Sequence, residues 1–211
     1  MKLLLTSSGI TKRSIAEALS AMVGKLPSET KVGFIPTAAN VEKGNKDWYI
    51  NQFVNLWRFG YSWIDVVDPS AADVDWKTRF AEVDVLFVSG GNTFYLLDQM
   101  KNTGLAQWIS ENSDSKVYVG VSAGTIVAAP TIEVANIPPG DVNMSGLTDF
   151  TGLNWVNFEV EPHCDKERFA VVAEYAKQRN YPVYAIDDQT AIKVLDDSVE
   201  VVSEGIWEVY N

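Results

Sequence analysis

The chain has 211 residues, of which 46% are hydrophobic and 21% charged, a composition typical of globular proteins and unlike that of disordered ones. Its 28 acidic and 17 basic residues give a net charge of −11, which argues against nucleic acid or an anionic membrane surface as a partner. With a single cysteine, Cys164, and a single histidine, His163, the chain has no internal disulfide framework, zinc ribbon or multi-histidine metal site. We expect neither a metal nor a cofactor.

The amino-terminal segment has only three consecutive leucines, too few for the apolar core of a signal peptide. No later run approaches the ~18 apolar residues of a membrane span. A lone cysteine also fits a reducing compartment. We therefore expect a soluble, cytoplasmic protein.

Short apolar segments alternate with amphipathic ones over the first two-thirds of the chain. The apolar segments predict strands at residues 2–6, 32–36, 63–67, 83–89 and 116–121. Their near-continuous apolarity is typical of strands that are buried on both faces of a parallel sheet. Between them, apolar residues recur at helical spacing, as in the sets Ile15, Leu19, Met22, Val23 and Tyr49, Phe53, Leu56, Trp57, and again at Leu105, Trp108, Ile109. This alternation predicts an α/β fold with a doubly wound, mostly parallel sheet.

The pattern changes after about residue 130. Prolines 130, 138 and 139 and Gly140 predict a loop with a short hairpin over residues 131–152. Residues 154–161 predict another strand, and the spacing of Phe169, Val172, Ala173 and Ala176 predicts a helix after it. Residues 182–210 predict an antiparallel meander that closes the edge of the sheet. Because no linker or repeat interrupts the chain, we expect one domain over residues 1–211.

The motif Gly120-Val121-Ser122-Ala123-Gly124 follows a predicted strand and precedes a predicted helix. In this context, G-x-S-x-G places a serine on a sharp turn with its hydroxyl exposed. The amides at the start of the helix would then face any developing negative charge. A turn made of small residues without a nucleophile is the alternative.

A second glycine-containing loop, Ser89-Gly90-Gly91-Asn92-Thr93, also follows a buried strand. Asn92 can cap the helix that begins there. The loop would lie at the carboxyl edge of the sheet, where open α/β sheets bind ligands. We expect the Gly91 and Ala123 amides to hold an oxyanion; a plain tight turn or an anion cradle remains the alternative.

His163 follows the predicted strand that ends at Glu161, and it is the one side chain able to act as a base near neutral pH for a serine nucleophile. A structural histidine is the alternative. Cys164 points to the opposite face of an extended chain from His163, so we interpret it as a buried small apolar residue. A third residue must orient His163, and the candidates are Asp141, Asp149, Asp165, Asp187 and Asp188.

Several motifs in chain order resemble those of the dipeptidase E family, cytoplasmic aspartyl dipeptidases related to cyanophycinases. The motifs are F-I-P-T-A at residues 34–38, V-S-G-G-N-T-F at 88–94, Y-V-G-V-S-A-G at 118–124, P-T-I at 130–132, G-L-N-W-V at 152–156 and P-H at 162–163. The resemblance covers most of the chain. It implies a three-layer fold like that of class I glutamine amidotransferases, with serine in place of their cysteine nucleophile.

Carried over position by position, the resemblance makes Ser122 the nucleophile and His163 the base, with oxyanion amides from Gly91 and Ala123 and with Asn92 beside them in the substrate-binding loop. The family position that is often Asp after P-T-I is Ile137 here. The family's alternative glutamate position falls on Asp188, which the resemblance therefore favours as the residue that orients His163.

Family members that prefer an N-terminal aspartate carry a longer, arginine-bearing segment after the histidine. Here only Lys166 and Arg168 follow closely enough to pair with a substrate carboxylate. Dipeptides with N-terminal Asp are therefore one candidate substrate, and short peptides in general are the broader one. Glu161 or Asp165 would bind the free α-amine.

Together these features predict a serine exopeptidase that acts on short peptides through Ser122, His163 and an acid. An amidohydrolase or esterase with the same residues is one alternative, and a non-catalytic protein that binds small anions is another. Seven tryptophans leave a homodimer open, although Trp48, Trp57 and Trp108 also fit the core faces of helices.

Overall fold

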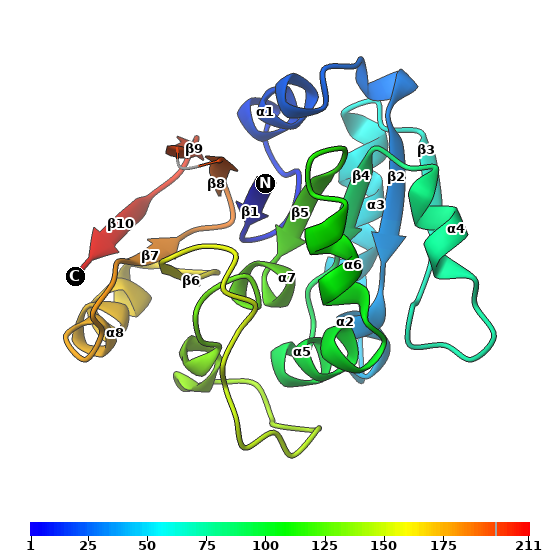
Figure 1. The fold of residues 1–211 in the computed structure, drawn as a ribbon. Coiled ribbons are helices and arrows are strands. Elements are labelled where there is room, and N and C mark those ends of the chain that lie inside the picture. Colours follow the sequence, from blue (N-terminus) through cyan, green and yellow to red (C-terminus); the bar gives the residue numbers. More distant parts are fainter. Residues whose placement is uncertain (197) are drawn as a thin grey trace.

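The computed structural model describes residues 1–196 and 198–211. Seven strands form one sheet in the order β3-β2-β4-β5-β1-β8-β9, and three form a second sheet in the order β10-β7-β6 (Figure 1). The strands are β1 (Lys2–Thr6), β2 (Lys31–Ile35), β3 (Trp63–Val66), β4 (Val85–Val88), β5 (Val117–Val121), β6 (Glu159–Glu161), β7 (Val183–Ile186), β8 (Thr190–Leu195), β9 (Ser198–Ser203) and β10 (Trp207–Tyr210).

The first five strands of the large sheet run parallel, while β8 pairs antiparallel with β1, and β9 with β8. All residues of β4 and β5 are buried, which explains their uninterrupted apolar sequence. The predicted α/β fold with a mostly parallel sheet is confirmed.

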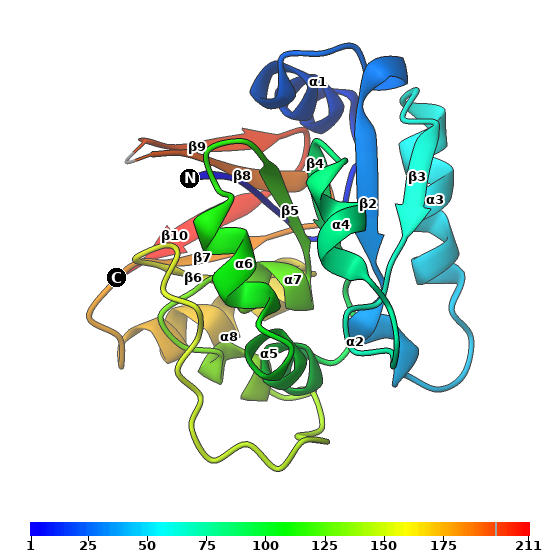
Figure 2. The ribbon, with the colours of Figure 1, turned by 45° about the vertical axis from the view of Figure 1, so that its right-hand side comes forward.

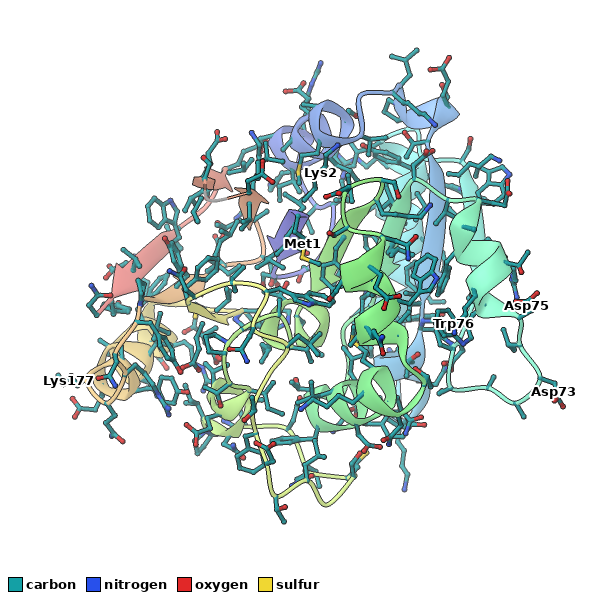
Figure 3. All side chains as sticks on the ribbon, in the orientation of Figure 1. Met1, Lys2, Asp73, Asp75, Trp76 and Lys177 are labelled. Atoms are coloured by element: carbon teal, nitrogen blue, oxygen red, sulfur yellow. The ribbon has the colours of Figure 1, made fainter. Side chains whose placement is uncertain are left out.

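Helices cover both faces of this sheet (Figure 2). They are α1 (Arg13–Val23), α2 (Thr37–Asn40), α3 (Asp47–Arg58), α4 (Trp76–Ala81), α5 (Thr93–Asn102), α6 (Leu105–Glu111), α7 (Ala123–Ile126) and α8 (Lys166–Ala176), with 3₁₀ turns at Pro27–Glu29 and Glu133–Asn136. Successive strand residues point to opposite faces, so Leu4 of β1 packs with α1 and α3, while Leu3 and Leu5 pack with α4 to α7. On the second face Trp76, labelled in Figure 3, meets Trp108 edge-on with ring centroids 5.9 Å apart.

The small sheet packs against α8, where Phe169, Val172 and Ala176 are buried against Val183 and Ala185 of β7. The helix predicted from this apolar spacing is therefore confirmed. Among the helices of residues 1–196 and 198–211, none combines the length and apolar character of a membrane span.

Two sequence predictions about the last third of the chain need correction. The strand predicted at 154–161 is only β6, because the amides of Gly152, Leu153 and Trp155 instead bond to carbonyls in the segment after α7. The predicted meander is divided, since β8 and β9 extend the large sheet whereas β7 and β10 join β6. Residues 131–152 form the predicted loop, with one isolated antiparallel bridge in place of a hairpin.

The tryptophans of α3 do not fill the core. Trp57 is 69% exposed and Trp48 is 39% exposed, so the helix-core interpretation of these two residues is wrong. Tyr49, Phe53 and Leu56 pack into the core as predicted. The polar Gln52 is buried beside them in place of Trp57.

Candidate active site

Ser122 stands on a sharp turn between β5 and α7. Its φ of 49° and ψ of −108° lie in a region that side-chain-bearing residues rarely occupy. Such backbone strain persists only where the surroundings impose it, and it is concentrated at functional sites. The turn thus has the geometry of a nucleophile elbow at the carboxyl end of a central strand.

Buried hydrogen bonds hold this elbow to the neighbouring strand β1. The Ser122 amide donates to the Thr6 carbonyl at 3.0 Å. The Thr125 hydroxyl donates to the same carbonyl at 2.8 Å, and the Thr6 hydroxyl donates to the Gly120 carbonyl at 2.8 Å. The position of Ser122 is therefore determined by main-chain groups of two central strands and by the hydroxyls of Thr6 and Thr125.

The loop after β4 lies directly against the elbow. Gly91 has a φ of 132°, and a Cβ there would come within 2.2 Å of the Ala38 carbonyl oxygen. A Cβ on Gly90 would lie 3.1 Å from the Ser122 Cβ. Only glycine therefore permits this approach. Within the described chain, the Gly91 and Ala123 amides donate to no acceptor, so both remain able to bind a ligand oxygen.

The side chain of Asn92 forms hydrogen bonds that hold the loop in place. Its side-chain oxygen caps α5 by accepting from the Tyr95 amide at 3.0 Å, and its Nδ2 donates to the Val142 carbonyl at 2.9 Å. Its own amide donates to the Ala38 carbonyl. The capping prediction is confirmed.

His163 and Asp188 meet at the mouth of the cleft. His163 Nδ1 lies 2.6 Å from Asp188 Oδ1, and both side chains are half exposed. With Asp188 as the acceptor, the shared proton resides on Nδ1, which leaves Nε2 as the basic nitrogen. No hydrogen bond joins Nε2 to Ser122 Oγ among the described contacts, although both residues line the same cleft.

Asp188 is stabilised as a carboxylate. Partial desolvation opposes its charge, but hydrogen bonds from His163, Ser7 and Ser8 and the charge of His163 hold the pKa of Asp188 well below its usual range. Asp188 is therefore ionised throughout the neutral range and suited to stabilise a protonated His163.

The other candidate acids are engaged elsewhere. Asp141 accepts from the first amide of α5 at 2.8 Å, and Asp165 caps the start of α8. Asp187 accepts from Gln189 and Thr190 at the start of β8 and from the Ile206 amide before β10, and Asp149 accepts from the amide two residues further on. None of these four contacts His163 within the described chain.

Sequence reasoning missed Ser7, which follows β1. Its hydroxyl donates to Asp188 Oδ1 at 2.6 Å and accepts from the His163 amide at 2.8 Å. It is completely buried. Its position directly after a buried strand, at the same sheet edge as Ser122, was the available signal.

Two cavities meet at Ser122, Asp141 and His163. The first, about 460 Å³, we call the loop cavity; its walls come from residues 134–141 and 161–171. The second, about 590 Å³, we call the sheet-edge cavity; its walls come from the loops after β1 and β4 and from α3. A substrate that crosses Ser122 would occupy both.

An ion pair supports the wall of the loop cavity. Arg168 binds the Glu161 carboxylate and also donates to the carbonyls of Ile137 and Pro138. Burial raises the pKa of Glu161 to about 7, against the lowering effect of Arg168. Lys166 lines a different pocket, beside Trp207. Neither cation is thus available to a substrate carboxylate as the sequence suggested.

Cys164 is buried against α8, as predicted from its position. Burial and the nearby charge of Glu161 raise the pKa of its thiol to about 12, so it is no thiolate nucleophile. Within residues 1–196 and 198–211, no three His, Cys, Asp or Glu side chains are grouped to hold a metal ion.

Comparison with known proteins relates the chain to a peptidase family. The model of peptidase family S51 matches residues 3–202. The chain is 34% identical over 172 residues to an uncharacterized peptidase of Pasteurella multocida, covering 79% of this chain and 82% of that protein. It is 30% identical over 169 residues to peptidase E of Escherichia coli, covering 77% and 69%.

A solved structure supports the fold over nearly the whole chain. A Listeria monocytogenes crystal structure, described as a candidate peptidase E protein, superposes with a TM-score of 0.79 at 27% identity and covers 97% of this chain and 98% of its own. The three-layer α/β architecture is thus shared with that structure.

Proposed function

The chain belongs to peptidase family S51, a family of serine peptidases, and we propose that it hydrolyses short peptides with Ser122 as nucleophile, His163 as general base and Asp188 as the residue that orients His163. The observation that carries the proposal is the 2.6 Å contact between His163 Nδ1 and Asp188 Oδ1 in the cleft that also holds the Ser122 elbow.

The reaction would proceed in two halves. Ser122 Oγ attacks the scissile carbonyl carbon while His163 Nε2 takes its proton. The Gly91 and Ala123 amides hold the resulting oxyanion, and His163 returns the proton to the departing amine as the C–N bond breaks. Water then attacks the acyl-enzyme, again through His163, and releases the free carboxylic acid and Ser122.

The proposal requires Ser122 and His163 to approach each other in the substrate complex. Catalytic hydrogen bonds are often long in ligand-free enzymes and shorten when substrate binds. The imidazole is half exposed, so the ring has room to rotate while Nδ1 keeps its hydrogen bond with Asp188. We expect the Ser122–His163 bond to form when the cleft is occupied.

The loop cavity favours an ammonium group over an acidic side chain. Asp141, Asp165 and Glu167 line it, while its one arginine is paired with Glu161. Both capping bonds to Asp165 use Oδ1, which leaves Oδ2 to accept from a peptide α-amine. We therefore infer an exopeptidase for peptides with an apolar N-terminal residue, and we place dipeptides with N-terminal Asp second.

The direct test is hydrolysis of Ala-Leu, Leu-Leu and Asp-Leu by wild type and Ser122→Ala, with chelator present. We expect wild type to cleave the first two faster than Asp-Leu, and Ser122→Ala to lose at least about 10³-fold in kcat. A fluorophosphonate should label wild type but not Ser122→Ala. Ser115→Ala is the matched control, because Ser115 precedes the start of β5 whereas Ser122 follows its end. It should behave as wild type.

Other results would assign a different function. Turnover that survives in Ser122→Ala would overturn the nucleophile. Ser122-dependent cleavage of esters or simple amides without any peptide cleavage would identify an esterase or amidohydrolase. Inert wild type that binds small anions equally well with Ser122→Ala would identify a binding protein.

A further inference from the structure

The sheet-edge cavity has one wall that the proposed chemistry does not use. This wall is a face of α3 that bears Trp48, Asn51, Gln52 and Asn55. Spacings of three, four and seven residues place these side chains on one side of a helix. The face therefore presents three carboxamides and one indole to the cavity.

Gln52 is the unusual member of this face. It is only 4% exposed, and its Oε1 is fully enclosed without a hydrogen-bond partner among the described residues. Buried polar groups in native proteins are almost always paired. Because Oε1 is closed off from the cavity, the atom of Gln52 that can meet a ligand there is Nε2, which also has no hydrogen-bond partner among the described contacts. A Cβ on Gly9 would lie 4.0 Å from the Gln52 Cγ, which places Gln52 beside the loop that starts with Ser7.

A carboxamide is complementary to a peptide main chain. With the oxygen of Gln52 enclosed, its NH₂ is the group that can bond a ligand, and it donates to a carbonyl or carboxylate oxygen. Because the group is neutral, it discriminates little between side chains and recognises the backbone that all peptides share. The chemistry of Gln52 therefore fits the main chain of a substrate residue.

The cleft offers one cation for a substrate carboxylate. Lys43 lines the sheet-edge cavity, and its ammonium group has no acceptor among the described contacts. Arg168, in contrast, is occupied by Glu161 and two carbonyls. The carboxylates that can receive an α-amine, Asp165 and Glu167, lie on the opposite side, in the loop cavity.

We propose that the sheet-edge cavity binds the leaving half of the peptide. Gln52 would bond the main chain of the C-terminal residue, Lys43 would pair with its free α-carboxylate, and Trp48 would pack against its side chain. The substrate class is then a peptide of two or three residues with a free carboxyl terminus. This inference rests on the proposed peptidase activity.

The carboxylate is tested with Ala-Leu and Ala-Leu amide as paired substrates. We expect wild type to prefer the free acid by about 10-fold or more in kcat/KM, equivalent to about 1.4 kcal/mol. Lys43→Gln should lose this preference through a higher KM for the acid, with the amide unaffected. Lys177→Gln removes the same charge outside both cavities, at the carboxyl end of α8 (Figure 3), and should retain the preference.

Gln52 is tested by Gln52→Met, which keeps the side-chain length without polar atoms. We expect KM to rise about 10-fold for both Ala-Leu and its amide, because each contains the main-chain groups that Gln52 would bond. Hydrolysis of a p-nitrophenyl ester, whose leaving group has no peptide main chain, should keep its kcat and so report an intact site. Gln52→Glu provides a second variant if Gln52→Met folds poorly. Its negative charge should raise KM more for Ala-Leu than for Ala-Leu amide.

The outcomes separate this inference from the function beneath it. Peptide cleavage with no preference for the free acid, or with unchanged KM in both Lys43→Gln and Gln52→Met, would overturn the inference and leave the peptidase standing. Ser122-dependent ester hydrolysis without any peptide cleavage would overturn both.

Discussion

The two sides of the cleft are built differently. The sheet-edge side rests on β1, β4 and β5, and main-chain hydrogen bonds such as Ser122 N to Thr6 O hold its groups. The loop side comes from residues 131–141, which contain only a short 3₁₀ turn. Side chains hold that segment in place: Arg168 bonds two of its carbonyls, and Asp141 bonds the start of α5.

This difference separates chemistry from selectivity. A nucleophile and oxyanion amides require positions that vary little, and strands of a buried sheet provide them. A segment held by a few side chains can change shape or sequence without disturbing the sheet. We therefore expect substitutions of the residues proposed for the chemistry to lower kcat, and substitutions that loosen residues 131–141 to change stability and KM.

The largest effect is expected from Asp188→Asn, on the catalytic side. An amide cannot stabilise a protonated His163 and also favours the wrong tautomer, so kcat should fall about 10³-fold or more with little change in KM. Steady-state kinetics with Ala-Leu measures this. Asp149→Asn, outside both cavities, is the control. Retention of a tenth of the wild-type kcat would remove Asp188 from the mechanism.

Gly91→Ala tests whether the loop after β4 must approach so closely. A Cβ there would collide with the Ala38 carbonyl at 2.2 Å, so the loop must move and the oxyanion amide with it. We expect kcat to fall about 10²-fold. Gly104→Ala is the matched control, because its φ is also positive but nothing lies within 4 Å of the added Cβ. Equal kinetic losses in both variants would show that strain alone is responsible.

Arg168→Met tests the loop side. It leaves the buried Glu161 without its partner and two carbonyls without a donor, so the free energy of unfolding should fall by about 3 kcal/mol. Urea denaturation measures the loss, and KM for Ala-Leu should rise while labelling of Ser122 persists. Lys166→Met, on the same helix but outside the cleft, should leave both unchanged. A stable Arg168→Met protein with wild-type KM would contradict the proposed difference between the sides.

A further effect concerns pH. The folded-state pKa of Glu161 is about 7, above its ordinary value of 4.5. A group with a raised folded pKa contributes stability that is complete below its unfolded pKa and is lost as pH rises through the folded one. Wild type should therefore lose stability between about pH 4.5 and 7 relative to Glu161→Gln. The difference in the free energy of unfolding between the two proteins, measured at pH 5 and at pH 8, tests this. The same difference at both pH values would refute the assignment.

Much of the fold was predictable because burial leaves a local signature. The strands expected at 2–6, 83–89 and 116–121 have apolar centres since both faces of the sheet are covered. The strand expected at 154–161 does not form over its first part. Its apolar side chains there pack into the core, and its main-chain amides bond to the segment after α7 outside any sheet. The prediction that Trp57 lies in the core was wrong because an apolar residue at helical spacing need not face inward.

The candidate site was only partly predictable. Ser122 and the two glycine-containing loops follow from motifs with a steric meaning, and the resemblance pointed to His163 and Asp188. Ser7 carried no motif of its own. Gln52 resembles any polar residue of a surface helix, so its burial and its missing partner could not be anticipated from the sequence.

The sequence by itself determined the parallel sheet, the elbow at Ser122 and the placement of reactive residues at strand ends, because each depends on patterns within a few residues. The tertiary structure alone decided which acid meets His163, how the final strands divide between two sheets, and which side chains line each cavity. Ser7 and His163, for example, are 156 positions apart. Contacts across such separations depend on how the whole chain packs, and no local pattern encodes them.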